Sequence, residues 1–302
     1  MRTRRLGDVH VSAIGLGAMP LSIEGRPGED AAIATIHAAL DAGVTLIDTA
    51  DSYHWHADET GHNESLVARA LTRYGGDTTP VLVATKGGRG RPGDGSWTVT
   101  GTPEHLKSAC DASRRRLGVD TLGLYQLHKP DPQVPWAESV GALAELLDAG
   151  KIRAAGISNV DADQIREAHA VLGGRLASVQ NRFSPAVRDS APELRLCEEL
   201  GVAFLPWSPL GGISRSVLES PVADDRGTAH GTYEPFHEVA REHGVSPQQV
   251  CLAWLLALSP AVVPIPGARR TASIRDSAAA ADLVLSAEEI ALLTSATPLD
   301  KP

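Results

Sequence analysis

The sequence has few cysteines, fewer basic than acidic residues and no long hydrophobic run. Each of these absences excludes a class of protein. Only three cysteines occur among 302 residues, and Cys110, Cys197 and Cys251 lie far apart, outside any Cys-x-x-Cys pair. A disulfide scaffold and a cysteine-based zinc site are therefore not expected, and the composition fits a reducing compartment. We expect a cytoplasmic protein.

Charge and hydropathy exclude two further classes of partner. The 28 Lys and Arg stand against 37 Asp and Glu, which gives a formal net charge of −9. A nucleic-acid binder needs a basic face, so no nucleic-acid partner is expected. The longest apolar run, Val250–Leu258, has about half the length of a membrane span. The apolar run Val11–Met19 behind the basic N-terminus lacks a small-x-small cleavage site, so export is not expected either.

What the sequence does contain is a regular alternation of short apolar runs with amphipathic segments. The runs are uniformly apolar, as in the strands of a parallel sheet that is covered on both faces. They are Ala13–Leu16, Thr45–Asp48, Val81–Thr85, Leu122–Leu127, Ile152–Ile157, Ala177–Gln180, Val202–Pro206 and Val262–Ile265. Eight strands and eight helices in alternation, without a linker, predict an α/β fold: one (β/α)8 TIM barrel domain over residues 1–302. A doubly wound sheet is the structural alternative.

The connections carry signals of their own. Arg4–Leu6 and Val9–Ser12 predict a short N-terminal β-hairpin that closes the bottom of the barrel. The irregular stretches Gly87–Gly101 and Gly211–Gly231 predict loops over a site. Helix starts are predicted at Thr102-Pro103 and at two capping-box sequences, and helix ends at four glycines. The boxes are Ser246-Pro247-Gln248-Gln249 and Ser286-Ala287-Glu288-Glu289, and the glycines are Gly43, Gly118, Gly150 and Gly201.

In such a barrel, functional residues collect at the C-terminal ends of the strands. The second strand ends at Asp48 and is followed by Tyr53, the third ends at Lys86, and the fourth ends at His128. We expect these four side chains to converge. The later strand ends carry Ser158-Asn159, Gln180-Asn181, Trp207-Ser208 and Pro266-Gly267-Ala268-Arg269.

Seven short segments at these strand ends resemble those of the aldo-keto reductases, in the same order over nearly the whole chain. They are Gly15-Leu16-Gly17-Ala18-Met19, Asp48-Thr49-Ala50-Asp51-Ser52-Tyr53, Ala84-Thr85-Lys86, Leu127-His128, Gly156-Ile157-Ser158-Asn159, Trp207-Ser208-Pro209-Leu210-Gly211 and Ile265-Pro266-Gly267-Ala268. Each segment is weak alone, but the order and spacing are specific. The runs 127–131 and 179–182 are most similar to the bacterial monomeric branches, including pyridoxal-reductase-like members.

The resemblance implies reduction of an aldehyde or ketone to an alcohol with a nicotinamide cofactor. It assigns Tyr53 as general acid, Lys86 and Asp48 as the pair that tunes it, and His128 as the residue that orients the substrate oxygen, as a neutral imidazole. A free tyrosine, with a pKa of about 10, is a poor acid near neutral pH. A lysine cation within about 4–6 Å favours the phenolate and lowers that pKa.

The resemblance also implies the cofactor site. Ser158, Asn159 and Gln180 match the contacts to the carboxamide, and Trp207 matches the aromatic ring that stacks on the nicotinamide. The remaining implied cofactor-binding residues are Gly17, Ala18, Met19, Asp48, Ser208, Pro209, Leu210, Gly211, Gly212, Ile265, Gly267, Ala268, Arg269, Ser273, Asp276 and Ser277.

The residues expected to contact the adenosine end of the cofactor depart from the family pattern. Ser273 stands where many members have an Arg or Gln that reaches the 2′-phosphate, and Ser277 replaces the usual Asn. Arg269 and Arg270 could supply the charge instead, so NADPH is favoured over NADH.

The substrate is expected to be a small carbonyl compound. We expect an open pocket, walled by Met19, Trp55, Trp97 and His128, that takes a ring-bearing compound against apolar faces. The protein is expected to be a monomer or a weak homo-oligomer. The alternative function is a cofactor-binding regulatory subunit of the same fold with little turnover.

Two other patterns are not assigned the chemistry that they suggest, and the loop around His54 and His56 is expected to line the substrate pocket. His54, His56 and His62 could suggest a metal, but the later strand ends carry Ser158, Gln180 and Gly267, so no metal is expected. Tyr125 and Lys129 match the Tyr-x-x-x-Lys pair of short-chain dehydrogenases. That pair needs a helix face, and this one falls in a predicted strand, where positions four apart are about 13 Å distant.

Overall fold

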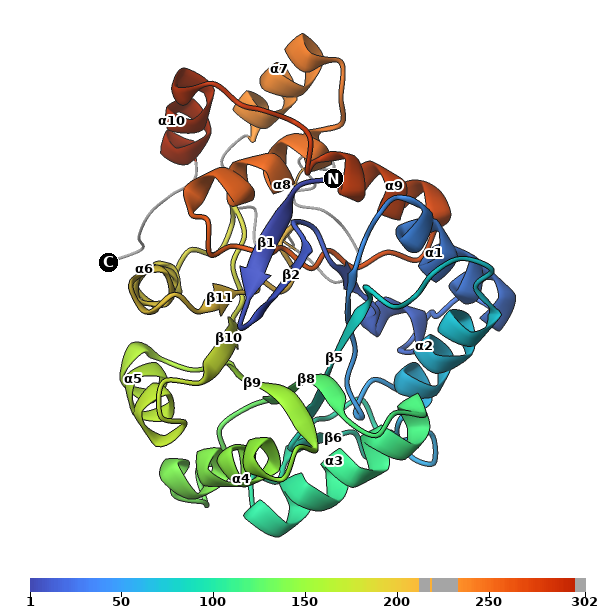
Figure 1. Ribbon diagram of the computed structural model, residues 1–302. Helices are drawn as coiled ribbons and strands as arrows, with labels where there is room; N and C mark the ends of the chain where they lie inside the picture. The colour runs from blue at the N-terminus through green and yellow to red at the C-terminus, as the bar shows by residue number, and fades with distance from the viewer. Residues whose placement is uncertain (212–217, 219–232, 297–302) are drawn as a thin grey trace.

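Seven parallel strands form a curled sheet inside a ring of helices (Figure 1). The computed structural model describes residues 1–211, 218 and 233–296. The strand order is β11-β10-β9-β8-β5-β4-β3, and every neighbouring pair is parallel. In chain order the strands are β3 (Leu16–Gly17), β4 (Leu46–Asp48), β5 (Leu82–Gly87), β8 (Leu122–Leu127), β9 (Ile152–Ser158), β10 (Leu176–Gln180) and β11 (Ala203–Phe204).

The segment that includes the predicted eighth strand, Val262–Ile265, closes the sheet without forming a regular strand. One isolated parallel bridge joins Val262 to Phe204 on β11, and another joins Gly267 to Gly17 on β3. The sheet is therefore closed on itself, which confirms the predicted (β/α)8 barrel and shows that the doubly wound alternative is wrong.

Prolines explain why this closing segment is irregular. The backbone N–H of Gly15 donates to the carbonyl of Pro264 at 2.9 Å, and that of Gly17 donates to the carbonyl of Pro266 at 3.0 Å. Neither proline has an N–H to return a bond, so a regular ladder cannot form along the segment.

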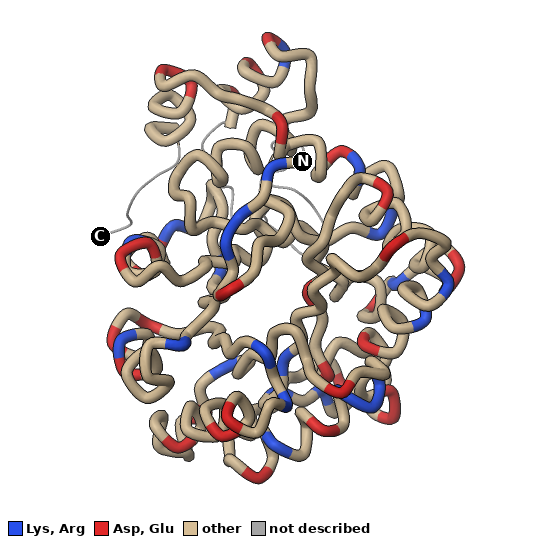
Figure 2. Tube along the Cα trace, viewed as in Figure 1, with Lys and Arg blue, Asp and Glu red and all other residues tan. Residues whose placement is uncertain are grey.

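In the described part of the chain, eight helices surround the barrel and two more lie outside it. The surrounding helices are α1 (Glu29–Asp41), α2 (His62–Arg73), α3 (Pro103–Leu117), α4 (Trp136–Asp148), α5 (Ala162–Val171), α6 (Ala191–Leu200), α8 (Pro247–Leu258) and α9 (Thr271–Ala279). The alternation of strands and helices did not predict α7 (Glu234–His243), whereas α10 (Ala287–Ser295) begins at the capping box predicted at Ser286. Both helices pack near α8 (Figure 1). Acidic and basic residues are interspersed along the outer helices (Figure 2).

The helix ends follow the predicted local signals with one exception. Thr102 caps α3 by accepting from the backbone N–H of His105 at 3.3 Å, and Ser286 forms a complete capping box with Glu289. At Ser246 only half of the predicted box forms, because the Gln249 side chain donates instead to Asp276 at 2.6 Å. Gly118 and Gly201 end their helices in the left-handed region, and Gly43 and Gly150 each follow a helix with a positive φ.

The predicted N-terminal hairpin closes one end of the barrel. Its strands β1 (Thr3–Leu6) and β2 (Val9–Ser12) are antiparallel, and they place Leu6 and Val11 in the apolar interior formed by the strands. Ser12 and Thr45 exchange two hydrogen bonds of 2.8 Å at the start of β4, so the hairpin lies at the N-terminal ends of the strands. Only the opposite end is left to form a site.

Residues 87–101 are not simply irregular, since they contain a second hairpin. Its strands are β6 (Arg89–Gly90) and β7 (Thr98–Val99). The other predicted loop, Gly211–Gly231, lies outside the described residues except for Gly211 and Leu218. A short 3-10 helix, η1 (Met19–Leu21), follows β3. Within the described parts of the chain, we find no helix with the length and apolarity that a membrane crossing requires.

The closing seam of the barrel gives a test of this fold. A Cβ added at Gly17 would lie 2.7 Å from the backbone oxygen of Ile265, so backbone would have to move. We expect Gly17→Ala to lower the free energy of unfolding by about 1–3 kcal/mol in urea denaturation. Gly141→Ala is the control, because no atom lies within 4 Å of a Cβ there, on α4. It should raise stability by roughly 0.5–1 kcal/mol. Equal free energies of unfolding for the two variants would contradict close packing of Gly17 against the closing segment at Ile265.

Candidate functional site

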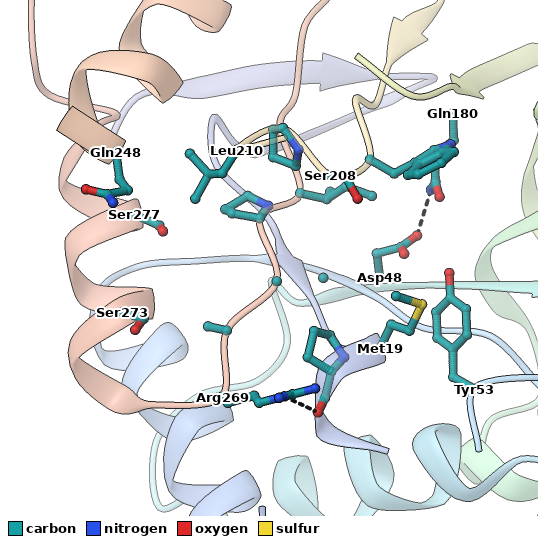
Figure 3. A pocket seen from close by; sticks show the side chains of 18 of the residues that line it. Met19, Asp48, Tyr53, Gln180, Ser208, Leu210, Gln248, Arg269, Ser273 and Ser277 are labelled. Atoms are coloured by element: carbon teal, nitrogen blue, oxygen red, sulfur yellow. Dashed lines mark hydrogen bonds between the residues drawn. The ribbon is translucent and has the colours of Figure 1, made fainter. Parts of the chain in front are cut away.

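A cavity of about 900 Å³ lies at the C-terminal end of the barrel. It extends from Tyr53 and His128 at one end to Ser273 and Asp276 at the other, and Figure 3 shows part of its lining. Most of the predicted site residues line it. They are Gly17, Met19, Asp48, Tyr53, Trp97, His128, Ser158, Asn159, Gln180, Trp207, Ser208, Pro209, Leu210, Ile265, Gly267, Ala268, Arg269, Ser273, Asp276 and Ser277.

Some predicted residues do not line the cavity. Lys86 is fully buried beside it, Ala18 is buried and donates its N–H to the carbonyl of Asp48 at 2.8 Å, and Gly211 lies just past Leu210. Gly212 lies outside the described residues.

The prediction for Trp55 is wrong. Its side chain is 38% exposed, and it does not line the cavity. The indole ring stacks instead on His56, with 5.1 Å between ring centroids, and the guanidinium of Arg26 lies over it at 5.9 Å. The loop after Tyr53 therefore turns this tryptophan toward solvent, whereas Trp97 does reach the cavity.

Sequence motifs did not assign several residues that line the cavity. These are Pro20, Gly25, Pro27, Arg89, Gln248 and Ala272. Gly25 and Pro27 lie in a connection between elements, where no periodic pattern tells which way a side chain points. The others lie in η1, β6, α8 and α9, and no motif assigned them to the site. Arg89 could have been suspected only from its place three residues after Lys86.

Lys86 joins two of the four converging residues through direct hydrogen bonds. Its Nζ donates to Asp48 Oδ2 at 2.6 Å, to Tyr53 OH at 2.9 Å and to the carbonyl of Thr49 at 2.9 Å. β4 and β5 are paired neighbours, which brings Asp48 and Lys86 together. A lysine with no exposed surface requires such partners, and here all three of its donors are used.

The fourth residue, His128, directly follows β8. Its ring meets the Tyr53 ring edge to face, with 5.6 Å between centroids and 83° between planes. Nδ1 lies 3.3 Å from Ser52 Oγ. Burial, and then the charges of Lys86 and Arg89, hold the pKa of His128 well below its ordinary value. The imidazole is therefore neutral at neutral pH, as predicted.

Burial dominates the pKa of Tyr53. It raises the pKa above the ordinary 10, and Lys86 lowers it by less. Lys86 thus lowers the pKa of Tyr53, as predicted. The net pKa of Tyr53 is nevertheless raised, not lowered as predicted, so the phenol keeps its proton. Burial alone would lower the pKa of Lys86, but Asp48 and Tyr53 outweigh it and the net shift is upward. Both upward shifts favour the protonated forms, an ammonium at Lys86 and a phenol at Tyr53.

The residues predicted to hold the nicotinamide end form one connected network. Gln180 Nε2 donates to Asp48 Oδ1 at 2.8 Å (Figure 3), and Ser158 Oγ donates to the carbonyl of Gln180 at 2.7 Å. Asn159 Nδ2 reaches Ser158 Oγ at 3.0 Å, and Asn159 Oδ1 accepts from Trp207 Nε1 at 3.2 Å. Asn159 adopts a left-handed φ of 59°, which is strained for a residue with a side chain. These bonds fix the orientation of all four side chains.

The far end of the cavity is built differently. Arg269 donates to the carbonyls of Pro20 at 3.3 Å (Figure 3) and Glu24 at 3.0 Å. Arg270 lies at the N-terminus of α9, lines the cavity and is exposed. Asp276 accepts from Ser246 Oγ at 2.7 Å and from Gln249 Nε2 at 2.6 Å.

The histidines near Tyr53 make ordinary contacts. His54 Nδ1 lies 2.6 Å from the carbonyl of His56, and His62 Nδ1 lies 2.9 Å from Ser22 Oγ. Across residues 1–211 and 233–296, no group of three His, Cys, Asp or Glu side chains is arranged to hold a metal ion.

Comparison with known proteins gives one consistent result. Residues 13–298 match the family model of the Aldo/keto reductase family. An uncharacterized oxidoreductase of Schizosaccharomyces pombe is 35% identical over 295 residues, which cover 96% of this chain and 88% of the relative. A probable aldo-keto reductase of Glycine max is 33% identical over 307 residues, with 96% of this chain and 86% of the relative covered.

Solved structures agree. The glycerol dehydrogenase of Gluconobacter oxydans has a TM-score of 0.81 and 28% identity, covering 99% of this chain and 97% of its own. An aldo-keto reductase from Klebsiella pneumoniae in complex with NADPH has a TM-score of 0.78 and 28% identity, covering 100% of this chain and 96% of its own. The chain therefore belongs to the aldo/keto reductase family and is an NAD(P)H-dependent oxidoreductase, as its sequence predicts.

Proposed function

We propose that this protein reduces an aldehyde or ketone to an alcohol with NADPH, and that Tyr53 is the general acid. The observation that carries the proposal is the buried chain of hydrogen bonds from Asp48 through Lys86 to Tyr53, beside the neutral ring of His128. When bound, the reduced nicotinamide supplies the hydride that the carbonyl carbon accepts. The protein must then supply the proton for the carbonyl oxygen.

Tyr53 is in the right protonation state to supply it. Burial keeps the phenol protonated until a stronger base, the developing alkoxide, forms beside it. Once the proton has left, the phenolate lies 2.9 Å from the ammonium of Lys86, which stabilises it. Asp48 holds that ammonium in place at 2.6 Å. Lys86 thus acts on the phenolate that is formed rather than by releasing the proton beforehand.

His128 is suited to orient the substrate. If Ser52 donates to Nδ1, the neutral ring carries its proton on Nε2, and Nε2 can donate a hydrogen bond to the carbonyl oxygen. A neutral ring cannot compete with Tyr53 as the acid. The two side chains would then contact the same oxygen with different tasks.

The cavity offers groups that fit each part of NADPH. Gln180 donates to Asp48 and keeps its carbonyl oxygen for the carboxamide, while Asn159 fixes the edge of the Trp207 ring, on which a nicotinamide could stack. At the other end Arg270 and the first turn of α9 line the cavity with the positive charge of a guanidinium and the positive end of a helix dipole. The similar structure that contains NADPH further supports this choice.

Replacing the proposed acid is the direct test. Tyr53→Phe removes only the phenolic oxygen, so kcat for aldehyde reduction should fall by about 10²–10⁴-fold, while the Kd of NADPH stays nearly unchanged. Steady-state NADPH oxidation and a fluorescence titration measure the two quantities.

Two outcomes of that test would contradict the proposal. Full activity of Tyr53→Phe would remove Tyr53 as the acid. Tight NADPH binding by the unaltered protein without turnover of any aldehyde in a broad panel would favour the regulatory subunit instead. Tyr74→Phe is the matched control, because Tyr74 bonds to Asp41 on the surface, away from the cavity.

The pKa shifts predict the pH profile of reduction. The reaction needs Tyr53 protonated and His128 neutral; the pKa of Tyr53 lies above 10 and that of His128 well below 6.5. We therefore expect kcat/KM for reduction to be flat from about pH 6 to about pH 9 and to fall only as Tyr53 loses its proton. A loss of activity centred near pH 6.5 would show that His128 titrates normally and would contradict this assignment.

Cofactor preference is the third test of this proposal. The Kd of NADPH should be lower than that of NADH. Arg270→Gln should reduce the ratio of the two Kd values by about 10-fold, because the variant loses a charge-assisted contact with the 2′-phosphate. Arg269→Gln should reduce this ratio less, since the Arg269 guanidinium is already held by two carbonyls. Arg275→Gln, on the same helix but outside the cavity lining, is the control. Equal affinity of the unaltered protein for both cofactors would argue against NADPH.

A further inference from the structure

The hairpin formed by β6 and β7 places a cation at the substrate end of the cavity. It begins directly after β5, which carries Lys86, and pairs Arg89 with Val99 and Gly90 with Thr98. Arg89 and Trp97, from its two halves, line the cavity together with Tyr53 and His128. Trp97 lies near His128, with 6.3 Å between ring centroids. The hairpin therefore supplies both an aromatic face and a positive charge beside the reacting groups.

Two arginines of this hairpin contact the same tryptophan but differ in their partners. The guanidinium carbons of Arg89 and Arg91 lie 4.4 and 4.8 Å from the Trp97 ring centroid. Arg91 is buried, forms an ion pair with Glu24 and donates to the carbonyl of His54 at 2.6 Å. Its charge is therefore neutralised within the protein, and it holds the hairpin in place.

Arg89 has no such compensation. Among the residues that the structure describes, no carboxylate pairs with it, and its Nε is buried without a hydrogen-bond partner. Burial lowers its pKa, and its charge reaches both Tyr53 and His128 strongly enough to affect their pKa values. A half-buried guanidinium with unused donors is costly unless a ligand supplies an anion.

The described residues that line the cavity offer no free carboxylate to Arg89. The two that line it, Asp48 and Asp276, are both engaged, Asp48 by Lys86 and Gln180, and Asp276 by Ser246 and Gln249 at the far end. A negatively charged group of a substrate would supply the partner that these residues do not.

We propose that Arg89 and Trp97 form a subsite for a carboxylate, and that the natural substrates are aldehydes or ketones that also carry one. The planar guanidinium can bind both oxygens of a carboxylate, and the Trp97 ring can cover the apolar chain that links it to the carbonyl. The carboxylate is unchanged in the reaction, so Arg89 binds and orients the substrate and takes no part in proton transfer. This inference rests on the proposed function of the same site.

The test compares two substrates that differ only in charge, para-formylbenzoate and its methyl ester. In the unaltered protein we expect kcat/KM to be about 10–100-fold higher for the carboxylate, mainly through KM. Arg89→Met keeps the length of the side chain and should lower kcat/KM for the carboxylate about 10–100-fold more than kcat/KM for the ester, which abolishes the preference. Arg89→Lys keeps the charge without the planar fork and should restore part of the preference.

A binding measurement gives a readout that does not depend on turnover. The product analogue para-(hydroxymethyl)benzoate should bind to the protein loaded with NADP⁺ about 10-fold or more weakly in Arg89→Met, as measured by calorimetry, while the Kd of NADP⁺ is unchanged. Arg153→Met is the control, since Arg153 is exposed and pairs with Asp8 in the N-terminal hairpin, at the other end of the barrel.

The outcomes separate this inference from the proposed function. If both aldehydes are reduced equally well and Arg89→Met changes neither rate, the subsite is wrong and the reductase stands. The same holds if Arg89→Met slows both substrates equally. If a phosphate-bearing aldehyde depends on Arg89 more than the carboxylate does, the subsite is for phosphate and the carboxylate assignment is overturned. If neither aldehyde is reduced and the carboxylate does not bind, both proposals fail.

Discussion

The rest of the site depends on the ammonium of Lys86, which is buried completely and therefore must be compensated where it lies. Its three donors reach Asp48, Thr49 and Tyr53, and none is left over. Burial of a charge is costly without partners. Removal of any one of these three acceptors would therefore leave the buried ammonium of Lys86 with an unsatisfied donor. Burial, and then the charges of Lys86 and Arg89, lower the pKa of the neighbouring His128 imidazole. Lys86 thus holds Asp48 and Tyr53 in place, while burial of the site keeps Tyr53 protonated.

The barrel explains how residues from separate segments reach this cation. Asp48, Lys86 and His128 come from three adjacent parallel strands, so their side chains arrive at one end of the sheet. The N-terminal hairpin fills the opposite end with Leu6 and Val11. The apolar packing at the hairpin end and the reactive groups at the opposite end are thereby kept apart.

The sequence predicted the parts of the molecule that regular periodicity and strand ends control. The strands, the hairpin and the four converging residues follow from apolar runs and from the residue after each run. Two features escaped this logic. The eighth strand is irregular because Pro264 and Pro266 lack N–H groups, and Trp55 faces solvent while Arg89 faces the cavity. Both of these side chains lie outside the barrel strands, where the path of the backbone and not sequence spacing decides the direction.

The distribution of charge in the cavity differs from the net charge of the whole chain. The protein carries a net charge of −9, yet the cations that line its cavity, Arg89, Arg269 and Arg270, have no carboxylate partner among the described residues. Surface charges are screened over about 8–10 Å in physiological salt, so the acidic exterior has little effect inside. Cations without a described carboxylate partner therefore line both ends of the cavity, Arg89 at one and Arg269 and Arg270 at the other. The cations at one end suit the phosphates of the cofactor. Arg89 at the other end suits a substrate whose negative charge contacts it while Tyr53 and His128 contact the carbonyl oxygen.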